Sequence, residues 1–243
     1  MNEYNREQSE AIIMVWKYLK RISPAERRKL RARIRNYLAF RKHVDTFLNS
    51  YFGEVCTETC YQSLYSACCT REGITTFFAD VVINVLISPD EAVDALLQVL
   101  GLPNPGLKCV YLGARGCLWR LKPIVCAMFV CEQARKTVFH EEPGALKAWE
   151  GLRRRSKRYT WPNRPVLFDG LETYFIEKGY ESSLMYCHNS PGLLRLKAHA
   201  KNQGNRKGGR VGKASRHVSV PGRGDPDQIR DCNTPMCKIL RSL

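Results

Sequence analysis

The sequence predicts a mainly α protein with one short β-hairpin and a long polar tail. Several segments repeat apolar residues at three- and four-residue spacing, which is the pattern of helices with one buried face. Two short β-prone segments flank a glycine-containing turn, and the composition changes abruptly after Ala198. With 243 residues, 44% of them hydrophobic, the chain is long enough to bury a core.

The first 50 residues predict a basic helical hairpin. Residues 7–21 carry apolar side chains at helical spacing after a polar start. Ser23-Pro24-Ala25-Glu26 has the form of a capping box with proline at the first helical position, so a second helix begins there and runs to about Asn49. We expect residues 1–50 to pack on the rest of the chain as one hairpin.

The middle of the chain predicts an irregular segment and two helices. Residues 51–71 are rich in cysteine and lack a regular period. Residues 74–87 are apolar almost all round, which indicates a buried helix. Ser88-Pro89-Asp90-Glu91 resembles a second capping box and predicts a short helix that ends at Gly101.

A small hairpin is predicted next, from Cys109–Leu112 and Cys117–Leu121 with a glycine-containing turn between them. Pro123 then begins a helix that carries both Cys126 and Cys131.

Two more helices are predicted, at 143–158 and 165–178. We expect residues 51–198 to form a cysteine-rich metal-binding body. Residues 199–243 are polar and glycine-rich, which predicts a disordered basic C-terminal tail.

Positive charge is concentrated in two segments. The net charge is +16, of which residues 17–43 carry +10 and residues 195–243 carry +9, whereas residues 44–194 carry −1. Such segments could bind nucleic acid or another polyanion, because lysine and arginine release counterions when they neutralise phosphates. The candidate contact regions are residues 17–43 and 199–243. The alternative is that these charges are solvated and only keep the protein soluble.

The chain predicts a cytoplasmic protein with no membrane contact. The N-terminus lacks the charged-then-apolar pattern of a signal peptide, and the most apolar run, 74–87, is interrupted by Asp80 and Asn84. Thiols stay reduced in the cytoplasm unless a metal binds them.

Eight of the eleven cysteines fall between residues 56 and 131. Thiolates are soft ligands that suit zinc and iron–sulfur clusters, and either cofactor takes four of them. The sequence leaves open whether the cofactor is an iron–sulfur cluster or zinc, and some of these cysteines could simply be buried thiols. The candidate metal ligands are Cys56, Cys60, Cys68, Cys69, Cys109, Cys117, Cys126 and Cys131.

Other reactive residues give weaker indications. Cys187 and His188 could add metal ligands. The favoured alternative is that Asn189 or Ser190 caps a short final helix and that His188 only hydrogen-bonds nearby. Cys232 and Cys237 lie in the tail, where an exposed pair of thiols is expected. The sequence has no phosphate-binding loop, zinc-protease motif or nucleophile elbow, so catalytic residues remain unknown.

Three cysteine segments resemble the YkgJ-type family of zinc- or iron-chelating cysteine-cluster proteins. Cys109-Val110-Tyr111-Leu112, Gly116-Cys117-Leu118-Trp119 and Lys122-Pro123-Ile124-Val125-Cys126 are similar to consecutive motifs of that family, with Lys122 where arginine is usual. Cys68-Cys69 stands for its cysteine pair, although Cys56 and Cys60 are more widely spaced than in the family.

The resemblance implies metal binding and covers about a third of the chain. A related cysteine pattern occurs in flagellin lysine methylases that look iron–sulfur dependent, which implies a possible protein-modifying enzyme. Three functions therefore remain open from the sequence: a metal-binding protein, an iron–sulfur enzyme, and a nucleic-acid-binding module with structural zinc.

Overall fold

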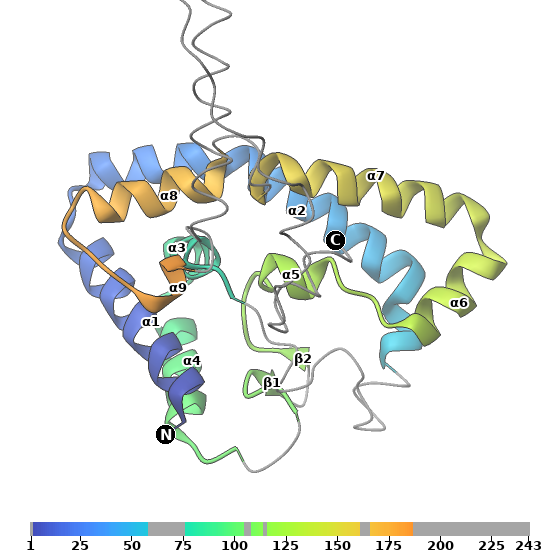
Figure 1. Ribbon diagram of the computed structural model, residues 1–243, viewed down its shortest axis with the longest axis horizontal. Coiled ribbons are helices and arrows are strands. Elements are labelled where there is room, and N and C mark those ends of the chain that lie inside the picture. Colours follow the sequence, from blue (N-terminus) through green and yellow to red (C-terminus); the bar gives the residue numbers. More distant parts are fainter. Residues whose placement is uncertain (1, 58–75, 105–107, 114–115, 161–165, 187–243) are drawn as a thin grey trace, which may run out of the picture.

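A computed structural model describes residues 2–57, 76–104, 108–113, 116–160 and 166–186. Helix accounts for 77% of these residues, which confirms the mainly α prediction (Figure 1). Their helices and strands, in chain order, are α1 (Glu3–Arg21), α2 (Pro24–Cys56), α3 (Phe78–Ile87), α4 (Asp90–Gly101), β1 (Leu112–Gly113), β2 (Gly116–Cys117), α5 (Ile124–Ala127), α6 (Glu132–Glu141), α7 (Pro143–Thr160), α8 (Leu167–Ile176) and α9 (Ser183–Tyr186).

Helix α3 is the centre of the fold. Every residue from Phe78 to Leu86 is buried, and the helix contacts α1, α2 and α8 (Figure 1). A helix that is apolar on all sides must be surrounded by other elements, so the predicted buried helix is confirmed, with its first turn at Phe78. Two polar residues within it, Asp80 and Asn84, are also buried.

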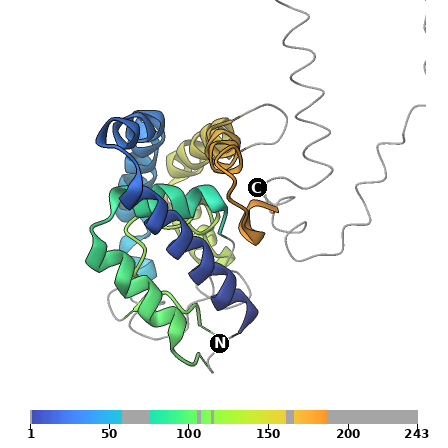
Figure 2. The same ribbon diagram turned by 90° about the vertical axis from the view of Figure 1, so that its left-hand side faces the viewer.

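The two N-terminal helices form, but they pack on different neighbours. Helix α1 lies against α3 and α4, whereas α2 packs on α6 and α7 (Figures 1 and 2). Helix α2 also continues to Cys56, beyond the predicted end near Asn49. The continuation has a clear cause, since Phe47 stacks on Trp149 of α7 and Phe52 contacts Phe139 of α6.

The N-cap of the first predicted capping box is confirmed, and the second predicted capping box is wrong. The Ser23 hydroxyl accepts the Glu26 amide at 3.2 Å, so Ser23 caps α2 as expected. Ser88 does not cap α4, whose N-cap is Pro89 without a side-chain hydrogen bond. Instead the Ser88 hydroxyl donates to Asn84 at 3.2 Å and closes the end of α3. A Ser-Pro pair between two helices can serve the first helix rather than the second.

The hairpin is confirmed in a shorter form, and the helix after it is interrupted. Strands β1 and β2 are antiparallel, with Leu112 opposite Cys117. The prediction that one helix carries both Cys126 and Cys131 is wrong, because α5 ends at Ala127. Cys131 is extended, and its sulfur accepts the Ala134 amide at 3.5 Å as the N-cap of α6. This cap allows a new helix to begin where the apolar pattern suggests continuation.

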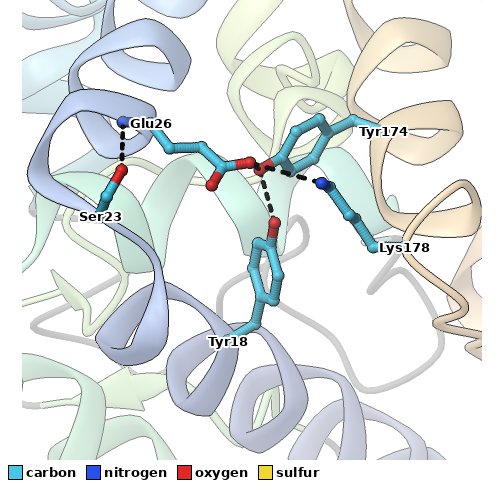
Figure 3. Close-up of polar contacts among 5 residues, drawn as sticks. All are labelled: Tyr18, Ser23, Glu26, Tyr174 and Lys178. Carbon is cyan, nitrogen blue, oxygen red and sulfur yellow. Dashed lines mark hydrogen bonds and ion pairs between the residues drawn. The ribbon is translucent and has the colours of Figure 1, made fainter.

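A polar cluster joins α1, α2 and α8, and we call it the tyrosine–glutamate joint (Tyr18, Glu26, Tyr174 and Lys178; Figure 3). The Tyr174 hydroxyl donates to Glu26 at 2.5 Å and lies 2.5 Å from the Tyr18 hydroxyl. Lys178 lies 3.7 Å from the same carboxylate oxygen. The Tyr174 hydrogen bond is the main reason that the pKa of Glu26 is lowered. The joint is internally satisfied and fixes three helices together.

Candidate metal centre

Cys109 and Cys117 are presented by the hairpin and the turn before it. The Leu112 amide donates to the Cys109 carbonyl at 3.0 Å, and the Leu118 amide donates to the Tyr111 carbonyl at 2.9 Å. Gly116, directly before Cys117, has a φ of 105°, a conformation that side chains other than hydrogen rarely allow. The two cysteines are therefore held by a short, conformationally restricted backbone.

Cys126 lies on the single turn of α5, which α3 holds in place. One oxygen of the buried Asp80 carboxyl accepts the Ile124 amide at 3.0 Å, and the other accepts the Phe77 amide at 3.2 Å. Asn84, one turn along α3, donates from its side chain to the Leu121 carbonyl. The polar residues of the buried helix thus fix both the approach to α5 and its first residue.

Asp80 also faces a buried arginine. Arg41 is 1% exposed, donates to the Tyr37 hydroxyl at 3.0 Å, and supplies a positive charge near Asp80. Burial raises the pKa of Asp80 to about 7, while the Arg41 charge and the two backbone hydrogen bonds oppose this shift. The carboxyl is consequently a structural group that links α2, α3 and α5.

Three thiols lie near enough to the hydroxyl of Tyr4, at the start of α1, to affect its pKa. Burial is the main reason that the pKa of Tyr4 is raised well above its usual value, and negative charge on Cys109, Cys126 or Cys117 raises it further. We call Cys109, Cys117 and Cys126 the thiol group; they come from the turn, the hairpin and α5.

Backbone amides lie close to two of these sulfurs. The amides of Tyr111 and Leu112 favour the thiolate of Cys109, and the amide of Trp119 favours that of Cys117. Burial outweighs these donors, so the pKa of Cys109 is raised to about 11 and that of Cys117 is also raised. These cysteines are therefore protonated at neutral pH unless a positive charge binds to them, which is unlike a nucleophilic thiol.

Buried donors without acceptors surround the thiol group. The hydroxyl of Tyr4, the hydroxyl of Thr76 and the indole nitrogen of Trp119 are buried and make no hydrogen bond of good geometry to a described residue, although Thr76 lies close enough to Tyr4 to lower the pKa of that tyrosine. Thr76 lies beside Tyr4, and Trp119 packs against Tyr111 with ring centroids 5.2 Å apart. An unsatisfied buried donor costs about 1–3 kcal/mol, so three of them in one region call for a physical explanation.

Helix α1 is fastened to this region by two further side chains. Asn5 donates to the Leu100 carbonyl at 2.9 Å, and the Tyr111 hydroxyl donates to Gln8 at 3.3 Å. Both α1 residues are buried. Their hydrogen bonds fix Tyr4, which precedes Asn5, between α4 and the hairpin.

The other candidate ligands are placed differently or lie outside the described residues. Cys56 is the last residue of α2, and Cys131 is the N-cap of α6. No disulfide joins any two of the five described cysteines. The candidates outside the described residues are Cys60, Cys68, Cys69, Cys187, His188, Cys232 and Cys237. The proposed contact region 199–243 also lies outside them.

The described residues do not form a finished metal site. Within them, no three Cys, His, Asp or Glu side chains are arranged so that they could hold a metal ion. The three cysteines of the thiol group therefore lie in one region but do not form a closed coordination sphere. In the same described ranges, no helix has the length and apolar character needed to cross a membrane.

Sequence reasoning missed the tyrosines and the buried aspartate. Tyr4 and Gln8 continue the apolar stripe of residues 12, 15 and 19 upstream at helical spacing, and this stripe could have extended the helix to its true start. A single aspartate in the apolar run 74–87 likewise indicates a buried partner, here provided by Arg41 and two amides.

Comparisons with protein families, with curated proteins and with solved structures give no match to this chain.

Proposed function

We propose that this protein binds an iron–sulfur cluster through cysteine thiolates, with Cys109, Cys117 and Cys126 as candidate ligands. The observation that supports the proposal is that all three thiols lie close enough to the buried Tyr4 hydroxyl to raise its pKa, although as placed the described residues form no metal-binding group of three. The three thiols come from a turn, a strand and a separate helical turn, so their proximity is a property of the fold. They are also the cysteines of the three segments that resemble the YkgJ-type family.

The chemistry of the surroundings fits an electron-rich sulfur centre. Amides of Tyr111, Leu112 and Trp119 favour the thiolate forms of their cysteines, and hydrogen bonds to sulfur are a general means of tuning clusters. The buried donors of Tyr4, Thr76 and Trp119 find no acceptor among the described residues. Thiolates and inorganic sulfide would accept such hydrogen bonds, which would remove the cost of burying them.

A fourth ligand is needed for a cluster or for zinc. Thr76 follows directly on the segment that carries Cys60, Cys68 and Cys69, and it lies beside Tyr4. The residue that follows this segment therefore lies near the thiol group. We expect at least one of those three cysteines to complete the site.

Burial disfavours free thiolates at this site. The raised pKa of Cys109 means that its thiolate forms at neutral pH only when a metal provides compensating charge. A bound centre would release these protons and link the hairpin to α5. The site would then contribute to folding as well as to any redox chemistry that the cluster supplies.

The test is anaerobic purification followed by visible spectroscopy and by analysis of iron, zinc and acid-labile sulfide. We expect a brown protein that contains iron and sulfide. A colourless protein with about one or two zinc ions per chain would replace the cluster with structural zinc. A protein without metal would contradict the proposal.

Serine variants identify the ligands. Cys109→Ser, Cys117→Ser and Cys126→Ser should each abolish metal binding, because the soft thiolate is lost. Cys131→Ser is the matched control, since serine caps a helix well and should preserve both α6 and the metal. Loss of metal from Cys131→Ser would add that residue to the ligands, as the sequence predicted. Full metal content in Cys109→Ser would exclude Cys109.

A further inference from the structure

Two packed helices carry most of the exposed positive charge of the described residues. Between Arg27 and His43, helix α2 contains eight lysines and arginines and no acidic residue. The second half of α7, from Arg153 to Arg158, adds five more without an acid. The sequence alone indicated only the α2 cations as a possible contact region. The α7 cations lie more than a hundred residues further along the chain.

The contacts between α2 and α7 bring these charges onto one surface. The Tyr159 hydroxyl donates to the Asn36 carbonyl at 3.1 Å, and Tyr159 stacks on Phe40 with ring centroids 5.3 Å apart. The Arg155 guanidinium lies 5.4 Å from the centroid of the same Phe40 ring. Arg158 follows Arg155 by three residues and therefore lies on the same side of α7.

Helix α2 contributes a straight row of cations beside this seam. Arg28, Arg35 and Lys42 are exposed and spaced by seven residues, which places them on one face of the helix. At 1.5 Å per residue the row spans about 20 Å, the axial length of roughly six base pairs. Ala32 and Ala39 are exposed between these cations, so no large side chain blocks close approach.

Few acids neutralise this surface. Among the described residues, Arg154 pairs with Glu150 at 4.0 Å, whereas no ion pair involves Arg28, Arg35, Lys42, Arg155 or Arg158. Glu26 of α2 instead belongs to the tyrosine–glutamate joint. We call the five cations Arg28, Arg35, Lys42, Arg155 and Arg158 the basic surface.

We propose that the basic surface binds the phosphate backbone of double-stranded nucleic acid. Of the exposed large hydrophobic residues in the described ranges, only Tyr51 and Leu146 belong to α2 and α7, and each lies nine residues along its helix from the nearest of the five cations. Membrane association by a helix uses apolar side chains inserted beside the cations, and single-stranded nucleic acid is held by exposed aromatic rings. A surface with cations and alanines alone fits the phosphates of a duplex, without base recognition.

The proposal is tested with the full chain and a 16-base-pair duplex of mixed sequence, prepared as DNA and as RNA. Fluorescence anisotropy gives the binding constant over a series of salt concentrations. Arg28→Gln/Arg35→Gln/Lys42→Gln should weaken duplex binding roughly tenfold or more and lower the salt-dependence slope by about 3. Arg155→Gln/Arg158→Gln should lower the slope by about 2, which only the predicted participation of α7 explains.

The matched control removes three cations elsewhere, as Arg6→Gln/Arg135→Gln/Lys136→Gln. It should leave the duplex affinity within about twofold, because these side chains lie on α1 and α6. All variants retain the cysteines and residues 195–243. Unchanged metal content and an unchanged circular dichroism spectrum would show that a loss of duplex binding does not come from loss of the metal or of the fold. An equal loss in the control, or an unchanged slope in both surface variants, would overturn it. Tighter binding to phosphatidylserine vesicles than to either duplex would also do so.

Discussion

The tyrosine–glutamate joint and the surroundings of the thiol group are both polar clusters between helices. They differ in whether their buried hydroxyls are hydrogen-bonded. In the joint, the hydroxyls of Tyr18 and Tyr174 bond to each other and Tyr174 donates to Glu26, with Lys178 beside the carboxylate (Figure 3). Around the thiol group, the buried hydroxyls of Tyr4 and Thr76 bond to no described residue.

This difference distinguishes a self-contained structural contact from a cluster that leaves buried donors unsatisfied. A polar cluster that satisfies its own groups needs nothing more to justify its burial. A cluster with buried donors and no acceptors is costly by itself, and it becomes favourable only when an electron-rich group is added. The unsatisfied donors near the thiols therefore mark one place where an electron-rich group would be stabilised, although buried guanidinium nitrogens of Arg27 and Arg41 also lack a hydrogen bond to a described residue.

The largest expected effect on stability concerns Asp80, whose buried carboxyl accepts the amides of Phe77 and Ile124. Asn can accept only one of the two amides that Asp80 accepts, so Asp80→Asn should lower the free energy of unfolding by about 2–3 kcal/mol at pH 5. Urea denaturation measures the change, and Asp94→Asn on the exposed face of α4 should have no comparable effect.

The size of this effect should depend on pH. The folded pKa of Asp80, about 7, lies above that of an unfolded aspartate, so between about pH 4 and 7 only the folded state keeps the proton. Raising the pH through this window therefore destabilises the wild-type protein relative to Asp80→Asn. The difference between the two should be smaller at pH 8 than at pH 5, and a larger difference at pH 8 would contradict the raised pKa.

A smaller effect is expected in the joint. Tyr174→Phe removes the hydroxyl that contacts both Tyr18 and Glu26, and it should cost about 1 kcal/mol in urea denaturation. Tyr180→Phe is the control, because that hydroxyl only accepts an exposed hydrogen bond from Arg21 at 3.0 Å. Equal stability of Tyr174→Phe and the wild type would mean that the joint is not the structural contact described here.

No loss of stability is expected from the same substitution near the thiols. Tyr4→Phe removes a buried hydroxyl with no described partner, so the metal-free protein should keep its stability or gain up to about 1–3 kcal/mol. In the cluster-containing protein it should lower the reduction potential, because one hydrogen-bond donor near sulfur is lost. Urea denaturation and redox titration measure the two outcomes. A cost equal to that of Tyr174→Phe would show that Tyr4 is already satisfied.

The helices were predictable because their signals are local. The apolar period of α1, the Ser23 cap and the apolar composition of α3 each lie within one segment. The ends that were wrong depend on distant residues instead. Helix α2 extends to Cys56 because α6 and α7 cover Phe52 and Phe47, and α5 ends early because Cys131 caps a new helix.

The candidate site was predictable only in part for a related reason. The cysteine spacing identified the residue types and the hairpin that presents Cys109 and Cys117. It could not show that α1 contributes Tyr4, or that Asp80 and Asn84 hold α5 in place, since these residues are 40 to 120 positions apart in the chain. Distances of that kind are set by packing around α3, which no local pattern encodes.

The complete burial of α3 has a consequence for how the protein opens. Amide hydrogens exchange with solvent only when their hydrogen bonds break, and a helix enclosed by α1, α2 and α8 offers no local route for this. The amides from Val82 to Leu86 should therefore exchange only when the whole described body unfolds. Their exchange rate would report global stability, whereas the exposed face of α4 would exchange through local fluctuations.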